Sequence, residues 1–300
     1  MDILSITHCT ASKSYMSEVK VSDVSPHQSF EEFFICWSDF LKNTKSMYQA
    51  KDLYTGGGFK KLSKGLSQKE FLIISAGLGL INSKKMIPSY ECTVSRGKLN
   101  SISDYFKDQF IYDQWWNYLI SSKYSLGFIN ENTKKSDIIL ISVTADYLKM
   151  IAQDLKLLNK KFYIFTGSKD LATSLGFKKN LMPYTEVFDG PDGTLRGTNR
   201  DFPQRTHTDF LRRIKQFGSF ELAFKSVEDD MKKWVPPTKH KNARKTNEEI
   251  INLIQHHEDK FNKVSDLLRY FRYELKVSCE ERRFKSLYKL FKEQHACPMI

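Results

Sequence analysis

Four short apolar runs constrain the fold of this chain more than any other feature. They are DILSIT (2–7), FLIISA (71–76), DIILISVT (137–144) and KFYIFT (161–166), and they lack the strict alternation of a half-exposed strand. A strand that is apolar on both sides must be covered on both sides, as in a parallel sheet between two layers of helices. Because helix-like segments separate the runs, the sequence predicts an α/β fold with a mostly parallel sheet flanked by helices.

The helix-like segments are recognised by apolar residues that recur at helical spacing. One of them begins with Pro203, a residue that suits the first turn of a helix. The segments with this spacing are residues 29–43, 102–122, 145–158, 203–217 and 219–233.

The segment 234–247 contains two prolines and five basic residues, counting its histidine. Prolines close together interrupt regular structure, so we expect a basic linker here. It would separate an α/β domain of residues 1–233 from a small helical domain of residues 248–300. The three helix-like segments of the tail, 247–258, 263–275 and 279–294, predict a unit that resembles a helix-turn-helix DNA-binding domain.

The tail carries basic residues at helical spacing, on a different side of each segment from its apolar stripe. Such a face suits contact with DNA phosphates, although lysines and arginines also simply solvate exposed helices. The residues that we expect to contact DNA are Arg269, Arg272, Arg282, Lys285 and Lys289.

Composition supports a polyanionic partner, because lysine and arginine exceed aspartate and glutamate by 12. The N-terminus does not read as a secretory signal, and no apolar run approaches the length of a membrane span. The five cysteines are scattered and form no CxxC pair. This pattern favours the reducing cytoplasm and argues against a disulfide framework or a zinc site.

Ligands of parallel sheets bind where the carboxyl ends of the strands meet. The residues that follow the predicted strands are therefore candidates for a binding site, and two tyrosines of nearby loops could join them. These candidates are Cys9, Lys13, Tyr54, Ser75, Gly77, Tyr90, Asp146 and Tyr147.

Several of these candidates have a simpler interpretation. Cys9 suits a small buried residue, since its neighbour His8 would point away from it in an extended chain. The GLGL sequence at 77–80 lacks the spacing and the Lys-Ser/Thr ending of a nucleotide loop. The glycines at 56–58 could offer backbone N–H groups to an anion or form a flexible loop. Asp146 stands at a helix start, where capping is the usual role.

The stretch GTNRDFPQR, residues 197–205, sets Asp201 between two arginines, with Gly197 and Pro203 restricting the backbone around it. Such a carboxylate is either part of a structural ion pair or aimed at a reaction site. The residue pattern leaves both possibilities open.

Several motifs together resemble the YaaA-like family of bacterial and phage proteins. Leu78 departs from the family pattern, which more often has a lysine followed by tyrosine there. The motifs are CTASK (9–13), AKDLYTGGGF (50–59), IISAGLGL (73–80), IPSYECTV (87–94), TADYLKMI (144–151) and MPYTEVFDGPDGTLRGTNRDFPQR (182–205). The resemblance implies DNA binding under oxidative stress, or the chemistry of modified nucleobases, as in base-excising defence proteins.

These observations lead to the hypothesis of a DNA glycosylase of phage defence or repair, which would flip a modified or damaged base out of duplex DNA. A carboxylate would stabilise the positively charged sugar, with Asp201 the first choice and Asp146 the second. Arg205 or Lys13 would hold a phosphate, and a tyrosine would stack on the base. We expect neither a metal nor another cofactor.

Two alternatives to the glycosylase remain open at this point. The chain could be a non-catalytic DNA-binding protein of a stress response, whose strand-end loops only touch the DNA backbone. It could also be an enzyme that processes free nucleotides or nucleosides, with the tail serving in oligomerisation.

Overall fold

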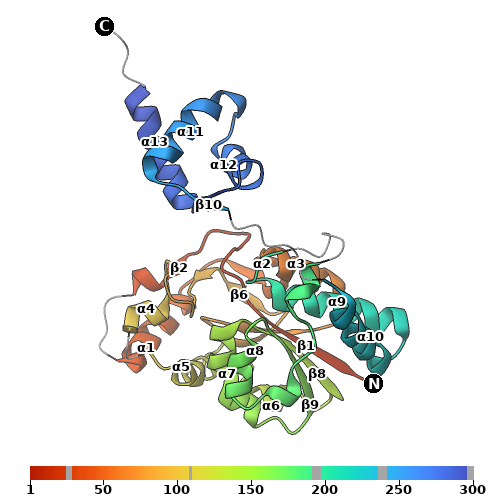
Figure 1. Ribbon diagram of the computed structural model, residues 1–300. Helices are drawn as coiled ribbons and strands as arrows, with labels where there is room; N and C mark the ends of the chain where they lie inside the picture. The colour runs from red at the N-terminus through yellow and green to blue at the C-terminus, as the bar shows by residue number, and fades with distance from the viewer. Residues whose placement is uncertain (25–28, 108–109, 191–196, 236–241, 296–300) are drawn as a thin grey trace. The chain divides into compact units, whose positions relative to one another are not determined.

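The computed structural model describes residues 1–24, 29–107, 110–190, 197–235 and 242–295. The chain divides into two compact units, Met1–Pro236 and Pro237–Ile300, called here the large unit and the small unit. The boundary falls within the segment 234–247 that the sequence predicts as a linker. The large unit contains the main sheet, and the small unit contains the last three helices (Figure 1).

The main sheet has five strands in the order β5-β4-β1-β8-β9. Strands β4, β1, β8 and β9 run parallel, and β5 pairs antiparallel with β4. The predicted mostly parallel sheet is thus confirmed, and all four apolar runs form its parallel strands. The strand bounds are β1 Ile3–His8, β4 Leu72–Ser75, β5 Gly79–Asn82, β8 Ile138–Ser142 and β9 Lys161–Phe165.

Helices cover both faces of this sheet, which is why its strands are apolar on both sides (Figure 1). Ser5 and Thr7 of β1 point to one face, where they bond side chains of helix α9 (Phe202–Phe217). Their neighbour His8 points to the other face, where its ring meets Tyr147 of helix α7 (Ala145–Lys156).

The remaining helices and short strands complete the large unit. Its helices are α1 Phe30–Lys42, α2 Ala50–Leu53, α3 Gly57–Gly65, α4 Ile102–Phe106, α5 Tyr112–Ile120, α6 Ile129–Asn132, α8 Lys169–Ser174 and α10 Phe220–Lys233, and its 3-10 helices are Val21–Asp23, Lys178–Asn180 and Glu186–Asp189. The short strands β2 (Val19–Lys20) and β7 (Tyr90–Glu91) pair with each other, as do β3 (Met47–Gln49) and β6 (Met86–Pro88).

The predicted single helix over 102–122 is wrong, because two helices, α4 and α5, occupy this range. The C-cap of α4, Lys107, has a φ of 49°, which ends the helix. Phe106 before this break and Phe110 after it both pack on Phe30, at ring-centroid distances of 4.3 and 5.7 Å. The aromatic pattern therefore continues across the interruption and imitates one continuous helix.

The three glycines at 56–58 do not form a loop but begin helix α3, with Gly56 at its N-cap. A Cβ on Gly56 would lie 2.6 Å from Thr10 Cγ2, and one on Gly58 would lie 2.8 Å from the Cβ of Asp201. The glycines therefore let the start of α3 pack closely between the loop after β1 and the start of α9.

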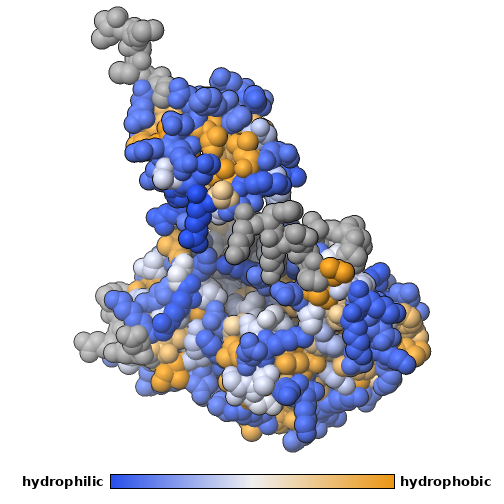
Figure 2. Space-filling view, viewed as in Figure 1, coloured by the Kyte–Doolittle hydropathy of each residue, from blue (hydrophilic) through white to orange (hydrophobic). Residues whose placement is uncertain are grey.

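The small unit packs helices α11 (Asn247–His257), α12 (Val264–Tyr273) and α13 (Glu281–His295) around its own apolar core. Ile250, Phe271 and Phe284 are fully buried in that core. The short strands β10 (Ala243–Arg244) and β11 (Val277–Ser278) pair in parallel beside the helices. On the face shown in Figure 2, hydrophilic residues surround a hydrophobic patch of this unit. No helix in the described ranges is long and apolar enough to cross a membrane.

Candidate functional site

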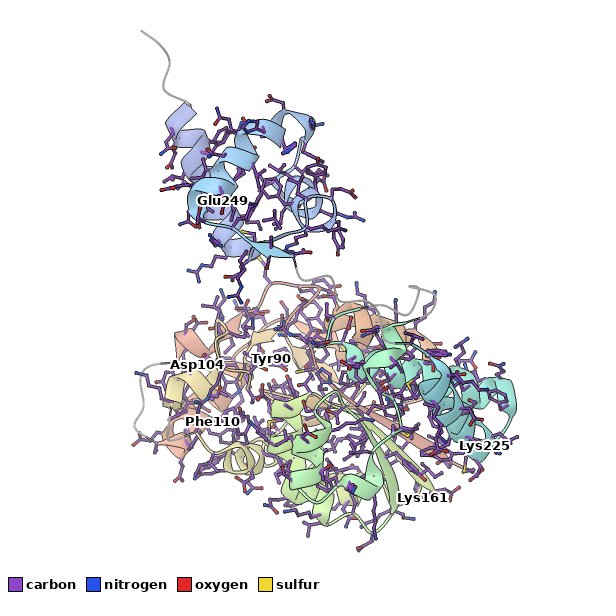
Figure 3. All side chains as sticks on the ribbon, viewed as in Figure 1. Tyr90, Asp104, Phe110, Lys161, Lys225 and Glu249 are labelled. Atoms are coloured by element: carbon purple, nitrogen blue, oxygen red, sulfur yellow. The ribbon has the colours of Figure 1, made fainter. Side chains whose placement is uncertain are left out.

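A group of hydroxyl and thiol side chains meets at the carboxyl ends of β1 and β4, where the sequence predicts a ligand site. We call Cys9, Tyr54, Ser75, Tyr90 and Tyr147 the strand-end cluster. Cys9 Sγ lies 3.1 Å from Tyr147 Oη. Tyr90 Oη lies 2.5 Å from Ser75 Oγ and 2.8 Å from Tyr54 Oη. Figure 3 shows Tyr90 within the large unit, away from Lys161 and Lys225 at its margin.

One proton of this cluster, that of Ser75, is fixed by its surroundings. Ser75 Oγ accepts hydrogen bonds from the backbone N–H groups of Gly77 and Leu78, which leaves its own proton for Tyr90 Oη. Burial raises the pKa of Tyr54, Tyr90 and Tyr147 well above the ordinary value. The three tyrosines are therefore neutral phenols at physiological pH.

Lys13 adds a cation beside the cluster. Its Nζ lies 4.6 Å from the centre of the Tyr90 ring and 5.9 Å from that of Tyr54. Burial lowers the pKa of Lys13 from its usual value. A lysine of this kind releases its proton more readily than one in water.

The structure corrects two expectations for this edge. The rings of Tyr54 and Tyr90 are fully buried, so their faces are not free to stack on a base and only their hydroxyl groups contribute to the cluster. Gly77 is also needed for packing, because a Cβ there would lie 2.8 Å from Tyr90 Cε2 and 3.0 Å from Trp37 Cζ2. The left-handed backbone conformation of the GLGL sequence falls at Gly79, whose φ is +81°.

His8 belongs to the same edge, although its pattern in the sequence did not single it out as a site residue. Its Nδ1 lies 3.1 Å from the carbonyl oxygen of Ser142, and its ring centre lies 5.1 Å from that of Tyr147. Burial, opposed by the Ser142 bond and assisted by the charge of Arg200, lowers the pKa of His8 to about 4. The one available signal was a histidine at the carboxyl end of a strand.

Asp201 stands at the N-cap position of α9 and forms an ion pair with Arg205. Arg205 Nε donates to Asp201 Oδ1 at 2.9 Å, and its Nη1 donates to Asp189 at 2.5 Å. In the described part of the chain, no hydrogen bond reaches the other oxygen of Asp201, Oδ2, and 27% of the side chain is exposed. Asp201 is thus ion-paired through Oδ1, while its Oδ2 can still accept a hydrogen bond.

Asp201 also lies near the edge that carries the strand-end cluster. Its Cβ abuts Gly58 of α3, and Gly56 of the same helix start abuts Thr10. One turn further along α9, the amide of Gln204 donates to Thr7 Oγ1 at 3.0 Å and to the carbonyl oxygen of His8 at 2.9 Å. The start of α9 is therefore bonded to the end of β1.

Arg205 does not suit the predicted role of holding a phosphate. Only 6% of its side chain is exposed, and two carboxylates already bind it. Gly197 allows this arrangement, because a Cβ there would lie 2.4 Å from Arg205 Nε. The exposed arginine of this stretch is Arg200, whose charge contributes to the lowered pKa of His8.

Asp146 lies in the first turn of α7, but its carboxylate does not cap the helix, whose N-cap is Thr144. Instead Tyr112 Oη donates to Asp146 Oδ1 at 3.1 Å. Burial, together with this carboxylate, raises the pKa of Tyr112 to about 12. Asp146 is therefore occupied by Tyr112, and this makes it a weaker candidate than Asp201.

The basic residues of the small unit differ in how far they are already paired. Arg272 donates twice to the carbonyl oxygen of Cys279, which ties α12 to the start of α13. Lys285 pairs with Glu281 at 2.7 Å and Lys289 with Glu293 at 3.6 Å. Arg269 and Arg282 are exposed and have no ion pair within the described ranges. Arg272 therefore has a structural role, and the expected phosphate-contacting face loses this residue.

Comparisons of the chain with protein-family models, with curated proteins and with solved structures find no match in any of the three. A functional assignment for this chain therefore depends on the geometry of its own residues. Within the described residues, no group of three or more histidine, cysteine, aspartate or glutamate side chains is placed to hold a metal ion.

Proposed function

We propose that the protein is a DNA glycosylase that cleaves the N-glycosidic bond of a modified or damaged base, in phage defence or repair. One observation carries the proposal. A partly exposed carboxylate, Asp201, lies at the same sheet edge as a buried cluster of hydrogen-bonding groups and a lysine of lowered pKa. A carboxylate beside the scissile bond is the usual requirement of glycosidic chemistry.

The proposed reaction is a hydrolysis. The bond between C1′ of the deoxyribose and the base nitrogen breaks, and its electron pair leaves with the base. Water adds its oxygen to C1′ and loses a proton. Asp201 Oδ2 stabilises the positive charge on the sugar and takes the proton from water, while Arg205 holds the carboxylate in place through Oδ1. Lys13, with its lowered pKa, donates a proton to the leaving base.

The DNA itself is held by phosphate contacts in this proposal. The exposed arginines Arg200, Arg269 and Arg282 supply the positive charge. The target nucleotide leaves the duplex because its glycosidic carbon is not accessible within the stacked helix. The YaaA-like motifs agree with this proposal, since the resemblance implies modified-base chemistry.

The test is incubation of the full-length protein with duplex DNAs that each carry one modified base, with free base and abasic sites as the readout. The panel contains hypermodified cytosines and thymines, uracil and alkylated purines. We expect base release from at least one substrate, and Asp201→Asn lowers the rate by roughly 100-fold while DNA binding persists.

Asp189→Asn is the matched control, since Asp189 is the other carboxylate on Arg205. It removes a comparable ion pair but leaves Asp201 in place, so we expect most of the base release to remain. Equal losses in the two variants would mean that the ion pairs only support the fold. Absence of base release across the whole panel would refute the glycosylase.

A non-catalytic DNA-binding protein is the second candidate, and one observation favours it. Arg205 ties Asp201, Asp189 and the carbonyl oxygen of Thr198 together, as a purely structural clamp would do. Under this alternative the panel gives no free base, and Asp201→Asn changes stability or DNA affinity alone.

A further inference from the structure

Two buried histidines of the large unit differ in how their ring nitrogens are used. His207 Nε2 lies 3.1 Å from Ser5 Oγ, and its Nδ1 lies 3.2 Å from Ser142 Oγ. Its ring stacks on Phe165 with centroids 4.7 Å apart. Both nitrogens of His207 thus have partners inside the protein, whereas in the described residues His8 has a partner for Nδ1 alone.

The partner of His8 fixes its tautomer. The Ser142 carbonyl oxygen accepts but does not donate, so Nδ1 carries the proton and Nε2 carries a lone pair. At neutral pH the ring is uncharged, because burial lowers its pKa to about 4. His8 Nε2 is therefore a hydrogen-bond acceptor that no described group satisfies.

This acceptor is unpaired but not sealed off. His8 as a whole is 4% exposed. The side-chain atoms that are both enclosed and unpaired among the described residues are Asp154 Oδ1 and His257 Nδ1. Because His8 Nε2 is not one of them, this atom keeps some contact with solvent-accessible space. An acceptor in such a place is open to a donor from a ligand.

The residues around His8 belong to the proposed site. The ring lies beside Tyr147 of the strand-end cluster. The backbone carbonyl of His8 is held by Gln204, three residues after Asp201. Arg200, the neighbour of Asp201, is the charged group that acts on the ring.

We propose that His8 Nε2 accepts a hydrogen bond from an N–H group of the bound base and so determines which bases the site takes. This inference rests on the proposed nucleobase site. A base that presents a donor to Nε2 pairs with it, while a base that presents a lone pair leaves two acceptors facing each other. His8 would thus be a specificity-determining residue, and Asp201 the group that acts on the sugar.

The experiment measures binding, so that it does not depend on turnover. Single-stranded oligonucleotides each present one test base in an otherwise abasic strand. The bases are used in pairs in which the second member lacks one N–H donor that the first has: cytosine and 2-pyrimidinone, adenine and purine, thymine and 3-methylthymine, guanine and 1-methylguanine. We expect the full-length wild-type protein to bind the donor-bearing member of at least one pair about tenfold more tightly.

His8→Asn is the informative variant. Its amide N–H replaces Nδ1–H toward Ser142, but it has no atom at the position of Nε2. We expect the preference within that pair to disappear while the protein stays folded. His207→Asn is the matched control, because it disturbs a buried histidine whose nitrogens are both used, and we expect it to lower the melting temperature and keep the preference.

Three outcomes separate the inference from the proposed function. Loss of the preference in His8→Asn alone supports the inference. Binding of the oligonucleotides with the same base preference by wild type and His8→Asn overturns the inference and leaves the proposed function standing. Failure of the wild-type protein to bind any oligonucleotide overturns the inference, while base release from the duplex panel decides the proposed function.

Discussion

Helix α9 carries two aspartate–arginine pairs with the same spacing, Asp201–Arg205 and Asp209–Arg213. Their surroundings differ. Asp209 is 2% exposed at its side chain, and both oxygens are used by donors from Tyr184, Arg212 and Arg213. Asp201 is 27% exposed and uses one oxygen.

The comparison shows that an i, i+4 ion pair says little about function by itself. The Asp209 pair lies between α9 and α10, where Arg213 also reaches Asp230 and Ser226, and no acceptor is left for a ligand. The Asp201 pair lies at the edge of the sheet, where acceptor capacity remains. Position in the fold, and not the pair, distinguishes a structural carboxylate from a candidate for catalysis.

The largest expected difference between the Asp209 and Asp201 pairs is in their contribution to stability. Asp209→Asn leaves Arg213 and Tyr184 without their buried carboxylate, and we expect the free energy of unfolding to fall by about 3 kcal/mol. Asp201→Asn breaks a more exposed pair, so we expect about 1 kcal/mol or less. Urea denaturation of both variants measures the difference. Equal losses of unfolding free energy in the two variants would mean that the Asp201 and Asp209 pairs are equally structural.

The loss of stability at low pH provides the second test, because α9 also contains the buried residue His207. Burial lowers the pKa of His207 to about 3 and that of His8 to about 4, against 6.5 for an unperturbed histidine. The unfolded chain therefore binds more protons as the pH falls below 6.5. Stability is lost between that value and about 4, by up to roughly 1.4 kcal/mol per pH unit for each histidine.

His207→Asn removes one of these two contributions. We expect the variant to be less stable at pH 7 but to lose stability less steeply on acidification, which unfolding curves over this pH range will show. An unchanged slope would mean that His207 does not titrate with unfolding.

The smallest effect extends the comparison to the small unit, where Arg282 has no ion pair within the described ranges and Lys285 is paired with Glu281. We expect Arg282→Ala to weaken DNA binding and to lower the slope of log affinity against log salt by about 1. Glu281→Gln, which frees Lys285, should strengthen binding. Fluorescence anisotropy in a salt series measures both, and no change in either variant would argue against DNA contact by α13.

The sequence predicted those parts of the fold that depend on burial of continuous apolar runs. Strands β1, β4, β8 and β9 follow from such runs, and their carboxyl ends brought Cys9, Ser75 and Tyr147 together as expected. The sequence did not predict that α3 begins at its glycines, because only the nearness of Thr10 and Asp201 explains them.

The orientation of side chains in the site was not predictable in the same way. Spacing alone suggests the pairing of Asp201 with Arg205, but their unequal exposure depends on how α9 packs against Gly197 and Asp189. Tyr54 directly follows the short helix α2 and Tyr90 lies in the two-residue strand β7, so no periodicity indicates that their rings are buried. His8 was missed because its free nitrogen becomes visible only when the Ser142 carbonyl oxygen is in place.

The bonds between β1 and α9 have a consequence for synthesis of the protein. Ser5 meets His207 across 202 positions of the chain, and Thr7 meets Gln204 across 197. A nascent chain on the ribosome that ends before α9 has the first strand but lacks the α9 side chains that bond Ser5 and Thr7. Folding of the large unit and assembly of its site therefore conclude together, late in translation, and contacts of such long range make that step slow.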